Sequence, residues 1–343
     1  MKIAIIGAGF FGITLGLILS KKHDVEIFEK SESILQGASS SNQFRFHHGY
    51  HYPRSQKTVN EIKNSKDLFI SYFGSNVFGK TKNYYLVAKK SKINFLKYKN
   101  FLIKNKLFFK IIKNSFKKDF IEKCILSDEK ILNYFYFKKK IKQKIKNSKL
   151  KLNLKKNFNK KNIKKFDKII LATYANNNFI LKKLGIKKFN EFKFELVEKI
   201  LIRLPKKYKD TSHVVVDGNF VCVDPYLSTK YHLLSDVKNS KLETVTGKFP
   251  KFKHRNKKYL NKGVIKNLKI SQFNNFIERS KNYLPFLENA KYIGSIFVVR
   301  AIMKNKEMTD ERTSSILNHS NKILSILSGK WNNCVYLAKN LNL

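Results

Sequence analysis

The order of apolar and polar positions along the chain predicts a series of short β-strands. Residues 3–6 (IAII) form an apolar run before a glycine-rich turn, and residues 24–30 (DVEIFEK) hold a second strand. Runs rich in β-branched and aromatic residues predict more strands at 169–171, 191–205, 212–226, 230–237, 323–327 and the start of 295–315. The dipeptide DG at 217–218 predicts a hairpin turn. Helices at intervals make this an α/β chain, α+β overall.

The first strand leads into a glycine fingerprint. Gly7, Gly9 and Gly12 form GxGxxG, with Phe10 and Phe11 between the last two glycines. In a strand-turn-helix unit these glycines permit a tight turn, approach of a pyrophosphate and close helix packing. Glu29 ends the second strand, where a carboxylate accepts hydrogen bonds from ribose hydroxyls, and Lys30 follows it. The spacing favours dinucleotide binding over a signal peptide.

Composition changes this picture little, although the formal net charge is +47. Seven arginines leave 64 lysines, which are scattered along the chain, as biased base composition would produce. The densest run, at 138–146, carries Ile141 and Ile145 four residues apart, as on a helix with one buried face. We therefore interpret the charge as a solvated surface and expect no nucleic-acid partner. The few arginines become informative, because a guanidinium binds planar anions in two places at once.

Cys124, Cys222 and Cys334 are isolated and lack the spacing of a disulfide framework or a zinc cluster. A reducing, cytoplasmic setting fits them. Apart from the amino-terminal run, no segment reaches the roughly 18 apolar residues of a transmembrane helix.

Residues 40–54 (SSNQFRFHHGYHYPR) concentrate three of the eight histidines and two arginines. A metal site, a nucleic-acid loop and a cofactor-facing loop are the candidates. His47 and His51 share a face only on a helix, which Gly49 and Pro53 disfavour, and no carboxylate lies nearby in the sequence. No metal is therefore expected. Histidines that only satisfy backbone groups in a packed loop remain an alternative.

Two further segments are candidates for the dinucleotide site. Residues 165–175 end a buried strand in Ala172, Thr173 and Tyr174, where an ordinary core strand is the alternative. Residues 321–341 predict a strand, then Ser328 and Gly329, then a helix from about Lys330. The amino terminus of such a helix stabilises negative charge, although Lys330 is also explained as one surface lysine among many.

Together these residues resemble the D-amino-acid oxidase superfamily of FAD-dependent oxidoreductases. The resemblance rests on GAGFFGITLG with Glu29, RFHHG at 45–49, NYYLVA at 83–88, KLKLNL at about 150–154, IILAT and the terminal SGK. It spans most of the chain. Tyr174 departs from the pattern, because glycine is usual after the alanine and threonine.

The resemblance implies a Rossmann-like FAD-binding domain of the two-dinucleotide-binding type, interleaved with a mixed-sheet substrate domain. The FAD-binding domain would take residues 1–80, 145–184 and 286–343, and the substrate domain would take residues 81–144 and 185–285. The implied cofactor-binding residues are Gly7, Gly9, Phe10, Phe11, Gly12, Glu29, Lys30, Asn42, Arg45, His48, Gly49, Ala172, Thr173, Ser328, Gly329 and Lys330. His47, His51 and Arg300 are the candidate catalytic residues.

The implied reaction is oxidation of a C–H bond next to an amine or hydroxyl, by hydride transfer to flavin N5, in a small anionic substrate such as an amino or hydroxy acid. Arg300, then Arg312, would bind the substrate anion, with Asp310 or Glu311 as alternative ion-pair partners of Arg300. Tyr226 and His232 are further substrate candidates, or else a core aromatic and a surface histidine. A redox-neutral flavoenzyme such as a sugar mutase, and a basic protein that binds nucleic acid or anionic surfaces, remain the rivals. The sequence indicates neither the substrate nor the oligomeric state.

Overall fold

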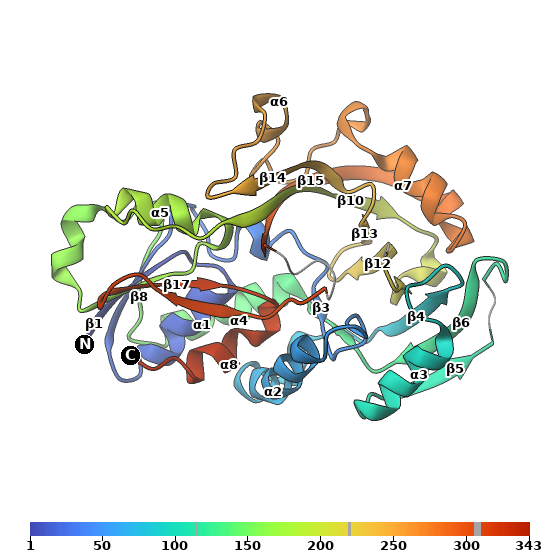
Figure 1. Ribbon diagram of the computed structural model, residues 1–343, viewed down its shortest axis with the longest axis horizontal. Helices are drawn as coiled ribbons and strands as arrows, with labels where there is room; N and C mark the ends of the chain where they lie inside the picture. The colour runs from blue at the N-terminus through green and yellow to red at the C-terminus, as the bar shows by residue number, and fades with distance from the viewer. Residues whose placement is uncertain (114–115, 219–220, 305–309) are drawn as a thin grey trace.

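The computed structural model describes residues 1–113, 116–218, 221–304 and 310–343. Two large sheets and one small ribbon organise it (Figure 1). The strands are β1 Lys2–Ile6, β2 Asp24–Phe28, β3 Arg45–Phe46, β4 Lys82–Ala88, β5 Phe109–Ile112, β6 Ile121–Ser127, β7 Lys130–Ile131, β8 Lys151–Asn153, β9 Lys168–Leu171, β10 Phe192–Arg203, β11 Thr211–Val216, β12 Val221–Tyr226, β13 Tyr231–Asp236, β14 Lys241–Gly247, β15 Lys291–Met303, β16 Ser315–Asn318 and β17 Ile323–Leu327. The α-helices are α1 Phe10–Leu19, α2 Gln56–Phe73, α3 Phe95–Lys104, α4 Tyr134–Lys146, α5 Asn177–Lys183, α6 His254–Lys257, α7 Phe273–Ser280 and α8 Cys334–Lys339. Short 3₁₀ turns connect several of these elements.

The first sheet has six strands in the order β16-β17-β9-β1-β2-β8. Its strands run parallel except β16, which pairs antiparallel with β17. Because helices cover both faces, the central strands are apolar throughout: Ile5, for example, pairs with Ile27 on one side and Ile170 on the other. Helices α1, α4 and α8 lie on one face and α5 on the other (Figure 1).

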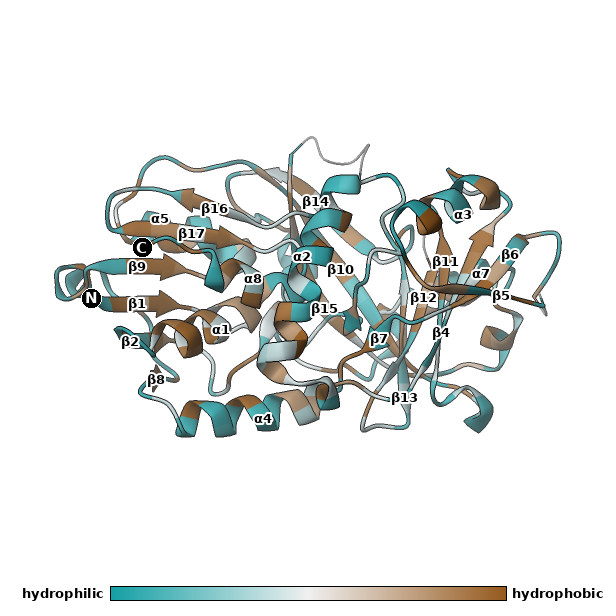
Figure 2. Ribbon diagram, turned by 90° about the horizontal axis from the view of Figure 1, so that it is seen from below, coloured by the Kyte–Doolittle hydropathy of each residue, from teal (hydrophilic) through white to brown (hydrophobic). Residues whose placement is uncertain are grey.

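The second sheet has nine strands, in the order β14-β10-β13-β12-β11-β4-β6-β5, with β15 paired along β10. It is mixed, since β4 and β11 run parallel while its other pairs are antiparallel. The DG dipeptide follows β11, and β11 and β12 pair as the hairpin signal predicts. Figure 2 shows the two sheets side by side along the molecule, with apolar strands at the centre of each.

The observed elements confirm the predicted strands and the amphipathic helix. In α4, Ile141 is buried and Ile145 packs against the core, while most of its lysines face solvent. Two elements depart from the proposed division into domains. Strand β15, within residues 286–343, joins the second sheet, and most of helix α4 belongs to residues 81–144 but packs against the first sheet. The loop expected after β15 lies partly outside the described residues. No helix within the described ranges is both long and apolar enough to cross a membrane.

Candidate functional site

The glycine fingerprint forms a tight turn between β1 and α1. Gly7 adopts a φ of +103°, which side chains disfavour, and a Cβ on Gly12 would lie 1.9 Å from the carbonyl oxygen of Gly7. Helix α1 therefore packs directly against the turn. Gly9 precedes the helix without a side-chain cap, and no acidic residue stands in the first helical turn. The Phe10 N–H donates to Ser39 Oγ at 3.2 Å, and the positive end of the helix dipole favours a bound anion such as a diphosphate.

Glu29 lies beside this turn. One carboxylate oxygen accepts a hydrogen bond from the Ala8 N–H at 2.8 Å, and the other accepts one from the Ser31 N–H at 2.8 Å. The carboxylate thus stands next to the fingerprint at the carboxyl end of β2, where the sequence places a ribose-binding acid. Lys30 is exposed.

A cavity of about 810 Å³ begins at the amino end of α1 and extends beneath the second sheet. This volume suits a ligand larger than a simple metabolite. Its lining includes these residues expected at the site: Gly9, Phe10, Phe11, Asn42, Arg45, His47, His51, Ala172, Arg300, Arg312, Ser328, Gly329 and Lys330. It does not include Gly7, Gly12, Glu29, Lys30, His48, Gly49, Thr173, Tyr226 or His232.

Some of the residues outside the cavity lining stabilise the loops next to the cavity. Gly49 has a φ of +122°, and a Cβ there would meet Val59, so the glycine serves the turn itself. The ring of His48 points to Asp128, with 3.1 Å between His48 Nδ1 and the carboxylate. Thr173 binds the Asn177 side chain through both its N–H and its hydroxyl.

Arg45 lies in a buried network at the cavity wall. Its Nε donates to Glu129 Oε2 at 2.9 Å, and a second nitrogen contacts Asp224 and Ser212. Arg45 and both carboxylates are at most 2% exposed. Arg45, expected to bind the cofactor, lines the cavity, while its guanidinium is committed to these partners. Its pKa lies well above the ordinary value, because the Asp224 and Glu129 charges outweigh the cost of burial.

His51 lies at the start of a hydrogen-bonded relay that ends in the same network. Tyr85 donates its hydroxyl proton to Glu129 Oε2 at 2.5 Å, so its oxygen accepts from His51 Nδ1 at 3.0 Å. This places the imidazole proton on Nδ1. The other nitrogen, Nε2, lies 3.8 Å from the Cys222 sulfur at the cavity wall. Burial, then nearby His47 and Arg45, holds the pKa of His51 well below its usual range, so the ring is neutral at pH 7.

His47 approaches the same carboxylate. Its Nδ1 lies 3.5 Å from Glu129 Oε1, and burial, aided by the Lys330 charge, lowers its pKa to about 4. His47, His51 and Glu129 place ligand atoms within 4.8 Å of one another. A carboxylate therefore does lie near the histidines, contrary to the sequence argument against a metal. Glu129 already accepts hydrogen bonds from Arg45, Tyr85 and the His48 N–H, which favours the relay over a cation.

The residues that follow β9 and β17 form another part of the cavity wall. Tyr174 has a φ of +55° at the position where glycine is usual, and its hydroxyl exchanges two 3.0 Å hydrogen bonds with the Ala301 backbone. After β17 the helix begins as a 3₁₀ turn at Trp331 and continues as α8, one residue later than expected. The Gly329 N–H donates to Ser314 Oγ, and Lys330 Nζ lies over the Tyr52 ring, 4.7 Å from its centre.

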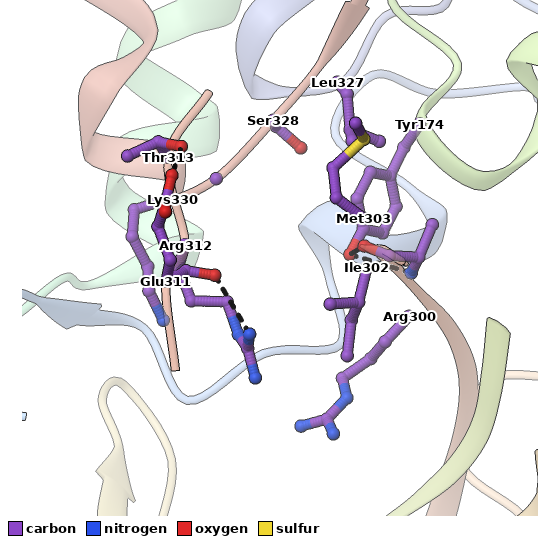
Figure 3. A pocket seen from close by; sticks show the side chains of 12 residues that line it. Tyr174, Arg300, Ile302, Met303, Glu311, Arg312, Thr313, Leu327, Ser328 and Lys330 are labelled. Atoms are coloured by element: carbon purple, nitrogen blue, oxygen red, sulfur yellow. Dashed lines mark hydrogen bonds between the residues drawn. The ribbon is translucent and has the colours of Figure 1, made fainter. Parts of the chain in front are cut away.

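A smaller pocket of about 140 Å³ adjoins this wall, and Figure 3 shows Arg300 and Arg312 approaching it from different segments. Each arginine already has an anionic partner. Arg300 binds the Glu195 carboxylate across the β10–β15 pair through Nε and a terminal nitrogen. Arg312 forms an ion pair with Asp310 at 2.6 Å. The salt bridge considered for Arg300 thus exists, but with Glu195 instead of Asp310 or Glu311.

Tyr226 and His232 lie away from the cavity. Tyr226 stacks on Phe44 at 5.6 Å within the main hydrophobic core. His232 is buried and its Nε2 lies 3.0 Å from the Tyr208 carbonyl oxygen. Alternate residues of a strand face opposite sides of the sheet. Ser235 of β13 faces the cavity, so His232, three residues earlier, faces the other way.

Five residues at or beside the cavity were not predicted from the sequence: Tyr85, Glu129, Lys199, Cys222 and Asp224. Cys222 and Asp224 are two apart on β12, and this alternation was a usable signal for a shared face. Val214 pairs with both Cys222 and Tyr85, which extends that face across three strands. Glu129 stands in the tight turn between β6 and β7, and no sequence pattern marks it.

No protein-family model matches the chain. Solved structures match it over nearly its whole length. Glycine oxidase from Geobacillus kaustophilus superposes with a TM-score of 0.70 at 12% identity, covering 97% of this chain and 91% of that one. L-proline dehydrogenase from P. horikoshii gives 0.71 at 14% identity, with 98% and 90% covered. FAD-bound L-α-glycerophosphate oxidase from Mycoplasma pneumoniae gives 0.70 at 14% identity, with 98% and 92% covered.

The fold is that of these flavoenzymes. The fold expected from the resemblance to the D-amino-acid oxidase superfamily is thereby confirmed. Sequence likeness to curated proteins is local: the FAD-dependent monooxygenase kojA of Aspergillus flavus is 42% identical over 59 residues, 17% of this chain and 14% of that protein. The FAD-dependent monooxygenase FPY4 of Fusarium mangiferae is 33% identical over 73 residues, 21% of this chain and 20% of that protein. The chain spans at most a fifth of these relatives.

Proposed function

We propose that the protein is an FAD-dependent oxidoreductase that oxidises a C–H bond next to an amine or hydroxyl of a small anionic substrate. The fold supports this, because glycine oxidase, L-proline dehydrogenase and L-α-glycerophosphate oxidase are built the same way. The local relatives are named as FAD-dependent enzymes as well.

The residues present fit FAD. The diphosphate would lie at the amino end of α1, where a Cβ on Gly9 would come within 2.9 Å of Ser39 Oγ and fill the cradle. Glu29 stands where a ribose would lie, and Ser328 to Lys330 line the far end of the same cavity. Bound FAD supplies a two-electron acceptor, with flavin N5 receiving the hydride.

The relay from His51 to Glu129 is the observation that carries the proposed chemistry. His51 Nε2 bears the lone pair of the ring, because Tyr85 fixes the proton on Nδ1. The Cys222 thiol donates a weak hydrogen bond to it, which a substrate proton would replace. The neutral ring accepts the proton of a substrate hydroxyl or ammonium group. The resulting positive charge is stabilised through Tyr85 by the buried Glu129 carboxylate, as in other carboxylate-supported histidine bases.

The charge of the cavity supports an anionic substrate. Twelve lysine and arginine residues line it, compared with three aspartate and glutamate residues. A cavity of one predominant sign concentrates ligands of the other sign and speeds their association.

The visible absorption spectrum of the purified protein tests this proposal. A yellow, two-banded spectrum whose chromophore is released as FAD by acid supports it, and a chromophore retained by the precipitate indicates a covalent link. A colourless protein that also takes up no added FAD refutes it. Anaerobic bleaching of the flavin by an amino or hydroxy acid then separates oxidation from redox-neutral chemistry.

A further inference from the structure

Among the twelve cations that line the cavity, the five arginines and two of the partly buried lysines form two contrasting groups, while Lys90, Lys92, Lys238 and Lys241 are exposed. In the first group are the arginines, and each of them has a carboxylate partner. The pairs are Arg45 with Glu129 and Asp224, Arg54 with Asp217, Arg279 with Asp236, Arg300 with Glu195, and Arg312 with Asp310. Their charges are thus largely compensated before any ligand enters.

Lys199 and Lys330 form the second group. Lys199 Nζ lies 3.4 Å from Ser235 Oγ, and Lys330 Nζ lies over the Tyr52 ring. Both are partly buried, and neither forms an ion pair with any carboxylate that the structure describes. A cation withdrawn from water without a counter-ion is unfavourable. The geometry therefore leaves two places in the cavity where an anion would be stabilised.

These two lysines stand on different walls. Lys330 follows β17 next to Ser328 and Gly329, on the side where the cofactor would lie. Lys199 projects from β10 in the second sheet, which roofs the cavity. A row of side chains crosses this roof from Lys199 through Ser235 to Cys222, since Ser235 pairs with Cys222 on the next strand. The row leads directly to His51.

We propose that Lys199 and Ser235 bind the carboxylate of the substrate, in place of Arg300. This assignment rests on the proposed function and names the anion site within it. The ammonium group and the hydroxyl both donate hydrogen bonds, and a carboxylate accepts from both at once. Substrate held there lies under the roof, in the same row as the base.

Arg300 has another role in this arrangement. Glu195 accepts from two of its nitrogens and also pairs with Lys241 at 3.1 Å. The three side chains connect β15, β10 and β14. A substrate carboxylate at Arg300 would have to compete with Glu195, whereas at Lys199 it meets a cation with no carboxylate partner among the described residues.

The pKa of Lys199 agrees with this geometry. Burial, together with the Arg300 charge from β15, lowers it to about 8, although Cys222 and Asp224 on β12 act to raise it. Ser235 on β13 is neutral. Because a bound carboxylate favours the charged ammonium, its affinity should fall as the pH rises above about 8.

The test is the affinity of the FAD-loaded protein for glycolate and for its uncharged analogue glycolamide, followed by the shift in flavin absorption. Lys199→Met should weaken glycolate binding about tenfold or more, as expected for loss of a partly buried ion pair. Lys199→Arg should stay within about threefold. Lys193→Met is the matched control, because Lys193 lies on the same strand and lines the same cavity.

Unchanged glycolate binding in Lys199→Met, or equal binding of glycolamide to the wild type, would overturn the assignment. So would a tenfold loss in Arg300→Met alone. A protein that takes up no FAD would refute the proposed function instead, and calorimetric titration of glycolate into the same variants would still decide the site. Lys199→Met should fold, since removing an uncompensated charge stabilises the ligand-free protein, and a rise in its melting temperature checks this.

Discussion

At the residue scale, the relay of His51, Tyr85 and Glu129 makes a prediction about turnover. Tyr85→Phe removes the hydroxyl that fixes the His51 proton and connects it to the carboxylate. We expect the rate of flavin reduction by a bleaching substrate to fall about tenfold or more, and His51→Asn to lower it about a hundredfold. Anaerobic stopped-flow absorption measures both.

Tyr84→Phe is the matched control, because Tyr84 points to the other face of β4 and stacks on His213. Equal reduction rates in wild type and Tyr85→Phe would remove the relay from the mechanism. Since the pKa of His51 lies well below its usual range, activity should decline only as the pH falls towards that low value.

Individual residues also show how much of the site could be predicted from the sequence. The fingerprint glycines and Glu29 were predictable because each follows from one local backbone requirement. The partners of Arg45 and Arg300 were not, since Glu129 and Glu195 lie 84 and 105 residues away from them and only strand pairing brings them close. Tyr174 was recognised as a departure from the pattern, but its hydrogen bonds to Ala301, which hold the left-handed backbone, required the structure.

At the element scale, the packing of α1 on the β1 turn makes a second prediction. A Cβ on Gly12 would lie 1.9 Å from a backbone oxygen that cannot rotate away. Gly12→Ala should therefore lower the free energy of unfolding by about 3 kcal/mol and displace the helix end proposed to bind the diphosphate. Urea denaturation and FAD titration measure the two effects.

Gly37→Ala serves as its control, because Gly37 has a positive φ of +60° but no atom within 4 Å of its Cβ position. Its cost should be limited to backbone strain, roughly 1–2 kcal/mol. Comparable losses in both variants would show that close packing at Gly12 is not the reason for the glycine.

Most strands were predictable, because apolar runs between turn residues identify them wherever both faces are buried. The assignment of β15 to a sheet was not. Strand β15 lies far from β10 in the sequence but pairs with it over its whole length. Only this long-range pairing brings Arg300 to the sheet that roofs the cavity. The alternation of side chains along β13 likewise determines that Ser235 faces the cavity and His232 does not.

At the scale of the whole molecule, buried titratable groups predict how stability depends on pH. The folded-state pKa is about 4 for His47 and about 3 for His213, because burial disfavours their charged forms. The unfolded chain binds these protons near pH 6.5, so stability is present above that pH and is lost as the pH falls towards 4. The expected loss is a few kcal/mol per histidine.

Two partly buried lysines also make stability increase with pH, in a higher pH range. The pKa values of Lys330 and Lys199 are lowered by burial to about 7 and about 8, below that of an unfolded lysine. Stability should therefore rise again between pH 7 and 9 as the folded protein gives up protons that the unfolded chain retains. Urea midpoints should increase in the order pH 5, 7, 9, and His213→Gln should reduce the increase between pH 5 and pH 7. A midpoint independent of pH would contradict this prediction.

The same two lysines have a consequence for the chemical reactivity of the chain. An amine reacts with electrophiles only in its deprotonated form, and an ordinary lysine side chain has a pKa of about 10.4. Lys330 and Lys199, with pKa values of about 7 and about 8, have a substantial neutral fraction at pH 8. A small acylating reagent should therefore mark the interior of the cavity before the highly charged surface, and the modified peptides would map its two walls.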